Sequence, residues 1–154
     1  MNILRTTFLA AALLLSPTFV SAQISSQPSI INNNSIVGVW YFNITIDGVP
    51  ECQCIQIDTF HADGTFDGPA NDHLSGDQRG TWTARGSDGE FRFTILQNNI
   101  NKDGTAAGLY IIKCTMTLTG ADSATGKFTF QVLNNAGTVL FPGTGSFKAT
   151  RIRS

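Results

Sequence analysis

The stretch Tyr110-Ile111-Ile112-Lys113-Cys114-Thr115-Met116-Thr117-Leu118-Thr119 alternates two kinds of side chain. Every second residue from Tyr110 to Leu118 is apolar or aromatic, whereas Lys113 and three threonines occupy alternate positions from 113 to 119. Successive side chains of a β-strand point to opposite faces of a sheet. The stretch is therefore predicted to be a strand with one buried face and one face in solvent.

The same alternation recurs from residue 36 onward, and no helical period of about 3.6 residues is sustained anywhere. Glycine-containing turn sequences, among them four Asp-Gly pairs, separate the alternating segments and supply the positive φ that tight hairpins need. Hairpins between consecutive strands give an antiparallel meander. Eight strands are predicted, over residues 36–46, 51–60, 65–68, 80–85, 90–100, 105–119, 127–133 and 138–152.

Each predicted strand has one apolar face, and no helix is predicted that could cover it. Strands of this kind bury their apolar faces and both sheet edges by closing into a barrel. We therefore predict an all-β fold, an eight-stranded antiparallel up-and-down barrel, with a two-sheet sandwich as the alternative. Gly143 and Gly145 lie on the same face of the last strand, where they allow a bend or the close approach of another group.

The first 22 residues have the pattern of a secretory signal peptide. Arg5 precedes an apolar run at residues 8–15, and small residues lead to a cleavage site after Ala22. The run is shorter than the roughly 20 apolar residues of a membrane-spanning helix. We expect a signal peptide at 1–22, a flexible polar leader at 23–35 and a barrel domain at 36–154. The protein is therefore expected to be secreted or periplasmic, with no membrane span.

The charged residues are few and balanced, with 10 Lys and Arg against 11 Asp and Glu. A nucleic-acid-binding face needs clustered Lys and Arg, and no such cluster occurs. Glycosylation sequons begin at Asn33 and Asn43, and they matter only in a eukaryotic source. The oligomeric state is left open.

Gly38-Val39-Trp40 near the start of the first strand, together with Arg151 on the last, resembles the calycin superfamily of lipocalins, fatty-acid-binding proteins and avidins. In those families the tryptophan of a Gly-x-Trp motif packs across one end of the barrel. A basic residue of the final strand lies over its ring in a cation–π contact. The resemblance implies a lipocalin/avidin-like barrel in which Trp40 takes the first role and Arg151 or Arg153 the second.

Two further segments, FHADGTF at 60–66 and Gly80-Thr81-Trp82, are similar to secreted bacterial proteins of unassigned function. The chain lacks the C-terminal helix of lipocalins and the helix pair of fatty-acid-binding proteins. The biotin-contacting pattern of avidins is not recognisable in it. These likenesses imply the fold and no activity.

Barrels of this size either fill their interior with side chains or hold one small ligand. The resemblance to calycins favours a hydrophobic lumen that binds a small hydrophobic or aromatic molecule. Phe141 and Phe147 are also expected to face inward, while no cofactor and no metal are predicted. The predicted ligand contacts are Trp40, Phe42, Phe91, Phe93, Tyr110, Phe128 and Phe130.

Two other functions stay open, a filled-core structural or interaction protein and an enzyme of the cyclase or isomerase type. Barrels similar to allene oxide cyclase steer an apolar substrate with few polar groups, so the absence of a catalytic triad motif does not exclude an enzyme. The candidate catalytic residues are Asp58, Tyr110 and His61. The connection at 68–80, which contains Asp72 and His73, is predicted to be a loop that covers one mouth of the barrel.

The second strand has two possible orientations. Alternation places two cysteines, Gln56 and Asp58 on one face and Ile55 and Ile57 on the other. Cysteine favours burial, whereas an inward Gln and Asp require hydrogen-bond partners, so neither orientation is preferred. Export permits a disulfide. A Cys54–Cys114 bridge, a metal or cofactor site and unbridged small side chains are the alternatives.

Overall fold

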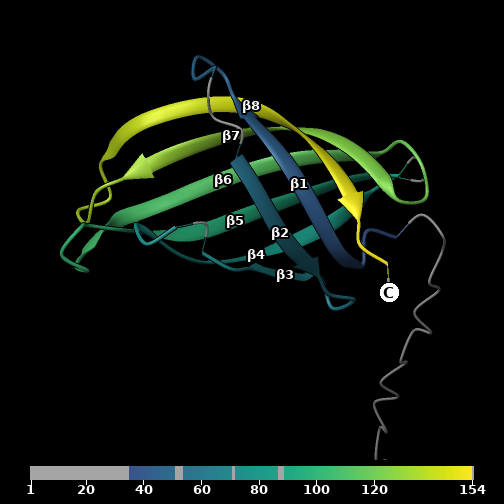
Figure 1. The fold of residues 1–154 in the computed structure, drawn as a ribbon, viewed down its shortest axis with the longest axis horizontal. Coiled ribbons are helices and arrows are strands. Elements are labelled where there is room, and N and C mark those ends of the chain that lie inside the picture. Colours follow the sequence, from purple (N-terminus) through teal and green to yellow (C-terminus); the bar gives the residue numbers. More distant parts are fainter. Residues whose placement is uncertain (1–34, 51–53, 71, 87–88, 154) are drawn as a thin grey trace, which may run out of the picture.

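A computed structural model describes residues 35–50, 54–70, 72–86 and 89–153. Eight antiparallel strands form a closed barrel in which each strand pairs with the next and β8 pairs with β1 (Figure 1). The predicted barrel is thus confirmed, and the two-sheet sandwich is wrong. The strands are β1 (Gly38–Ile46), β2 (Cys54–Phe60), β3 (Thr65–Gly68), β4 (Ser75–Arg85), β5 (Glu90–Ile100), β6 (Ala106–Leu118), β7 (Ser123–Leu133) and β8 (Val139–Arg151).

The predicted signal peptide and all of the predicted leader except Ser35 lie outside the described residues. Within the described ranges, no helix has the length and apolar character needed to cross a membrane.

Glycine conformation at the hairpins follows the prediction. Glycines of the predicted turns have φ between 69° and 86°. At two of these turns an aspartate precedes the glycine and accepts hydrogen bonds from the threonine that follows it, Asp63 from Thr65 and Asp103 from Thr105. The hydrogen bond from the threonine hydroxyl is the largest cause of the lowered pKa of each aspartate. Side chain and backbone thus stabilise the same turn.

Strand β4 is longer than predicted. It begins at Ser75 rather than residue 80, so the predicted long loop shortens to residues 69–74. The inward positions at its start are Gly76, Gln78 and Gly80, and none of them is apolar. The alternation of apolar and polar residues that identifies a strand is therefore missing here. The segment nevertheless pairs with β3 and β5.

One end of the barrel, here called the tryptophan end, is closed by Trp40. Its ring is fully buried, and its Nε1 donates to the Ile36 carbonyl at 2.7 Å. The Arg151 guanidinium lies 4.7 Å from the ring centroid and donates to the carbonyls of Val37 and Ser35. The closure expected from the Gly-x-Trp resemblance is therefore present, with Arg151 as the basic residue. Arg153 instead donates to Asp122, whose Oδ1 also lies 3.7 Å from Arg151 Nε.

Aromatic rings fill the barrel next to this end. Phe60 is at the centre of the group, with its ring centroid 5.0 Å from that of Phe66 and 5.2 Å from that of Phe93. Trp82 packs against Phe60 and Phe91 in edge-on geometry. Aromatic pairs of this kind contribute about 0.5–1.5 kcal/mol each beyond their buried area. This half of the interior is a packed core.

Replacing Arg151 by methionine tests the closure of the tryptophan end. Methionine retains much of the aliphatic stem but removes the cation and both donors to backbone carbonyls, so Arg151→Met is expected to lower the free energy of unfolding by about 2 kcal/mol. The exposed pair of Arg153 with Asp122 provides a matched control, and Arg153→Met is expected to cost under about 1 kcal/mol. Urea unfolding measures both, and equal losses would contradict the assigned role.

Candidate functional site

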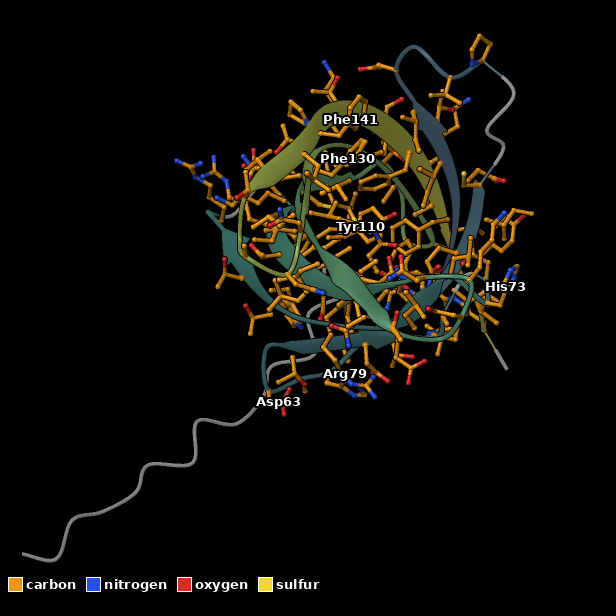
Figure 2. All side chains as sticks on the ribbon, turned by 90° about the vertical axis from the view of Figure 1, so that its left-hand side faces the viewer. Asp63, His73, Arg79, Tyr110, Phe130 and Phe141 are labelled. Carbon is orange, nitrogen blue, oxygen red and sulfur yellow. The ribbon has the colours of Figure 1, made fainter. Side chains whose placement is uncertain are left out.

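The other end of the barrel, here called the cavity end, contains the turns at residues 101–105 and 134–138. Figure 2 looks onto this end, with Tyr110 and Phe130 inside the ring of strands. A cavity of about 180 Å³ lies within the lumen. Tyr110 and Phe130 are half-buried and line it, so the cavity reaches the surface beside them. It is lined by Phe42, Ile44, Ile46, Cys54, Gln56, Asp58, Gln78, Phe93, Ile95, Gln97, Tyr110, Ile112, Cys114, Phe128, Phe130 and Phe147.

One wall of the cavity, from β7, β8 and β1, is aromatic. Phe128 faces Gly145 across the β7–β8 pair, and Phe130 faces Gly143 in the same register. A Cβ placed on either glycine would collide with the ring opposite. The phenylalanines therefore lie against the strand backbone instead of filling the lumen, and this arrangement leaves space for the cavity.

The opposite wall is polar and is here called the polar belt: Gln56 and Asp58 of β2, Gln78 of β4 and Gln97 of β5. All four side chains are buried. Gln56 and Asp58 form the inward face of β2. Ile55 and Ile57 form its outward face and are 55% and 44% exposed. The open question about β2 is thus settled, because its cysteine-bearing face points into the lumen.

Gly68 of β3 allows the polar belt to continue across the sheet. A Cβ on Gly68 would collide with the Asp58 carboxylate and the Gln56 amide nitrogen. Gly68 is also the register partner of Gln78, and Gln78 is the partner of Gln97. Because β3 contributes no side chain at this position, the polar groups of β2 lie next to those of β4.

The hydrogen bonds of the polar belt are incomplete. Gln56 Nε2 donates to Asp58 Oδ1 at 2.8 Å and to the Pro69 carbonyl at 3.2 Å. Gln97 Nε2 donates to the Gly76 carbonyl at 3.0 Å. The amide oxygens of Gln56 and Gln78, however, are buried without a hydrogen-bond donor within the described ranges. Buried polar atoms are normally paired, so two unpaired acceptors beside one cavity make the lumen a candidate site.

Asp58 has an unusual acidity for a carboxylic acid. Burial raises its pKa from 3.8 to about 7, although the hydrogen bond from Gln56 acts in the opposite direction and Asp67 adds a smaller rise. Near neutral pH the group can therefore accept or release a proton. Perturbed carboxyl groups in cavities are candidates for functional residues.

The predicted site residues separate into two groups. Five of the seven predicted ligand contacts line the cavity: Phe42, Phe93, Tyr110, Phe128 and Phe130. Trp40 and Phe91 are buried but belong to the packed tryptophan end, outside the cavity lining. Phe141, predicted to face inward, is 56% exposed because it lies at the rim of the cavity end, where its ring contacts Phe130.

Of the three candidate catalytic residues, Asp58 and Tyr110 line the cavity and His61 does not. His61 is exposed in the β2–β3 turn, where its Nε2 lies 2.5 Å from Asp67 Oδ1. His73 is also exposed, in the short β3–β4 connection. Neither histidine shares a site with Asp58.

Cys114 is a free, buried thiol, so the Cys54–Cys114 bridge is not formed. Burial raises the pKa of this thiol well above its usual range, and Asp58 adds to the effect. Cys52 lies outside the described residues. Across the ranges that the structure covers, no three His, Cys, Asp or Glu side chains form a group that could hold a metal ion.

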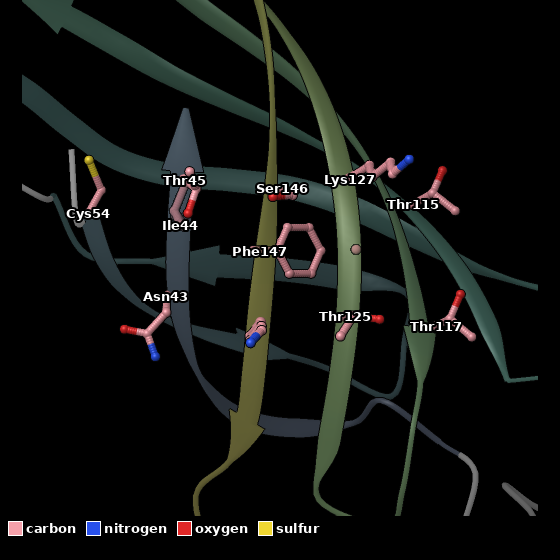
Figure 3. A pocket seen from close by; sticks show the side chains of 12 residues that line it. Asn43, Ile44, Thr45, Cys54, Thr115, Thr117, Thr125, Lys127, Ser146 and Phe147 are labelled. Carbon is pink, nitrogen blue, oxygen red and sulfur yellow. The ribbon is translucent and has the colours of Figure 1, made fainter. Parts of the chain in front are cut away.

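A larger hollow, of about 720 Å³, lies on the outer face of the barrel over β6, β7, β8 and β1 (Figure 3). Threonine and serine hydroxyls and two lysines, Lys127 and Lys148, form much of its lining. Neither of the unpaired buried amide oxygens belongs to this surface. The lumen is therefore the better candidate site.

Sequence reasoning missed Gln78 and Gln97. Alternation along β5 carries the inward face from Ile95 to Gln97, so that signal was present. Gln78 had no comparable signal, since its neighbours on the inward face are glycines.

A comparison of the chain with models of protein families, with curated proteins and with solved structures finds no match.

The raised pKa of Asp58 predicts that the free energy of unfolding depends on pH. Between pH 4 and 7 the folded state keeps a proton on Asp58 that the unfolded state has released, so the free energy of unfolding should fall as the pH rises through this range and level off above about pH 7. A shift of this size corresponds to a loss on the order of 4 kcal/mol. Urea unfolding of the wild-type protein and Asp58→Asn at pH 5 and pH 8 measures the effect.

An asparagine side chain cannot ionise, so Asp58→Asn is expected to be more stable than wild type at pH 8 and to lose most of the pH dependence. Asp77→Asn is the control, because Asp77 is an exposed carboxylate of β4. If Asp58→Asn followed the wild-type profile, Asp58 would not be the group that titrates.

Proposed function

We propose that the protein is an exported, calycin-like barrel that binds a small, largely hydrophobic molecule in its lumen. The cavity beside unpaired polar groups is the observation that carries this proposal. A purely structural barrel would be expected to fill its interior, as this one does at the tryptophan end. The signal-peptide pattern at residues 1–22 supports export.

The size of the cavity limits the ligand. A dry engineered cavity of about 150 Å³ binds benzene, whereas drug-sized ligands occupy about 300–1,000 Å³. A lumen of about 180 Å³ therefore suits a single ring with a short substituent. The aromatic wall would contact the ring and the polar belt would contact the substituent.

An isomerase or cyclase activity is the second candidate, favoured by one observation. A carboxyl group with a pKa of about 7 lines the cavity, opposite its aromatic wall. General acids and bases work best when their pKa is near the operating pH. Asp58 would transfer the proton in such a reaction, and the Tyr110 hydroxyl is a further polar group of the cavity lining.

Ethylbenzene is a suitable probe of the lumen because it has one ring and no polar group. Titration calorimetry at pH 7.5 is expected to give a dissociation constant of about 1 mM or tighter. Ile112→Trp fills the cavity from β6 and is expected to weaken binding at least about tenfold, since the added ring competes for the same space.

Ile111→Trp is the matched control, because residue 111 precedes Ile112 on the same strand and faces the outer surface. It should bind like wild type. Near-ultraviolet circular dichroism of both variants checks that they are folded. Equal binding by both variants would contradict binding in the lumen. Absence of binding by ethylbenzene and by the two polar analogues tested below would contradict the proposed function.

A further inference from the structure

We propose that the polar belt binds the ammonium group of a single-ring primary amine, such as an arylalkylamine, whose ring lies against the aromatic wall. This inference rests on the proposed function and adds the chemical class of the ligand. It comes from the unpaired amide oxygens of Gln56 and Gln78 and from the Asp58 carboxyl group that Gln56 contacts.

The buried polar-belt atoms without a partner within the described ranges are both acceptors. The Gln56 amide nitrogen already contacts Asp58 and the Pro69 carbonyl, which identifies its other amide atom as the oxygen. That oxygen and the corresponding oxygen of Gln78 have no donor within the described ranges. Asp58 Oδ1 accepts from Gln56, and the carboxylate retains a second oxygen. Two buried amide oxygens of the described chain therefore lack donors, and ionised Asp58 is a third acceptor beside Gln56. A primary ammonium group supplies three N–H donors.

Other head groups match these acceptors less well. A hydroxyl group has one donor, and a ketone or an ether has none. A carboxylate on the ligand would lie against Asp58 and two amide oxygens. The described cavity lining contains no lysine or arginine to balance its negative charge. An ammonium group pairs with Asp58, and a buried charge needs such a partner.

The aromatic wall also favours a cation. Phe42 and Phe147 lie with ring centroids 5.2 Å apart at a steep angle, and both line the cavity with Phe93 and Phe128. The faces of aromatic rings attract cations, most strongly where water is excluded. The lumen thus combines a carboxyl group, amide oxygens and aromatic rings around a space for one ring.

Binding of an amine should release a proton. An aliphatic amine is already protonated below about pH 9, and the complex pairs its ammonium group with ionised Asp58. Below about pH 7 the empty protein carries the proton on Asp58, and that proton leaves to solvent when the amine binds. The apparent affinity should then fall up to about tenfold for each pH unit below 7. Tyr110 and Cys114 of β6 also face the cavity, and Asp67 of β3 is the other charged group that acts on Asp58.

Titration calorimetry with 2-phenylethylamine and 2-phenylethanol at pH 5.5, 6.5 and 7.5 tests the inference on the full-length mature protein. At pH 7.5 the amine is expected to bind at least about tenfold more tightly than the alcohol. The affinity of the amine should fall as the pH is lowered, whereas that of the alcohol should stay nearly constant. Asp58→Asn should abolish the preference for the amine, and Gln78→Met should reduce it.

The control is again Asp77→Asn, which should keep both the preference and its pH dependence. Equal binding of alcohol and amine, or a preference that survives Asp58→Asn, would overturn the inference. If ethylbenzene binds and the amine does not, the lumen is a binding site but not for amines. If none of the three molecules binds, the proposed function itself is wrong.

Discussion

The pairing of β8 with β1 closes the sheet into a barrel. It removes both sheet edges and determines which face of each strand is enclosed. The same pairing makes Arg151 the register partner of Trp40, so the residue that caps the tryptophan end comes from the strand that closes the barrel. Closure of the sheet and closure of one barrel end are thus consequences of one register.

Closure creates an interior that the chain fills unequally. At the tryptophan end, rings centred on Phe60 pack against one another and leave no role for a ligand. Toward the cavity end, Phe128 and Phe130 are placed opposite glycines, so their rings lie along the wall. The total aromatic content therefore does not decide between a filled and a hollow barrel. The residue type opposite each ring does.

This difference explains what the sequence could predict. Alternation and Asp-Gly turns were sufficient for the eight strands and their meander, because both are local patterns. The Trp40–Arg151 contact followed from a resemblance. The orientation of β2 and the inward position of Gln78 could not be predicted, since they depend on Gly68 making room between β2 and β4. Predicted contacts at Trp40 and Phe91 lie outside the cavity because alternation gives the face of a residue, not its level along the barrel.

The polar belt has a cost that the fold alone does not explain. A leucine or phenylalanine at the position of Asp58 would add buried apolar area, whereas the carboxyl group must either hold a proton or lie ionised in a dry interior. Gly68 adds to this cost, because it gives up side-chain packing in β3 to make room for the pair formed by Asp58 and Gln56. Stability at neutral pH would favour an apolar replacement at each of these positions. Their combination beside a cavity is what a binding or catalytic site requires, since a ligand that supplies the missing donors recovers free energy that the empty barrel lacks.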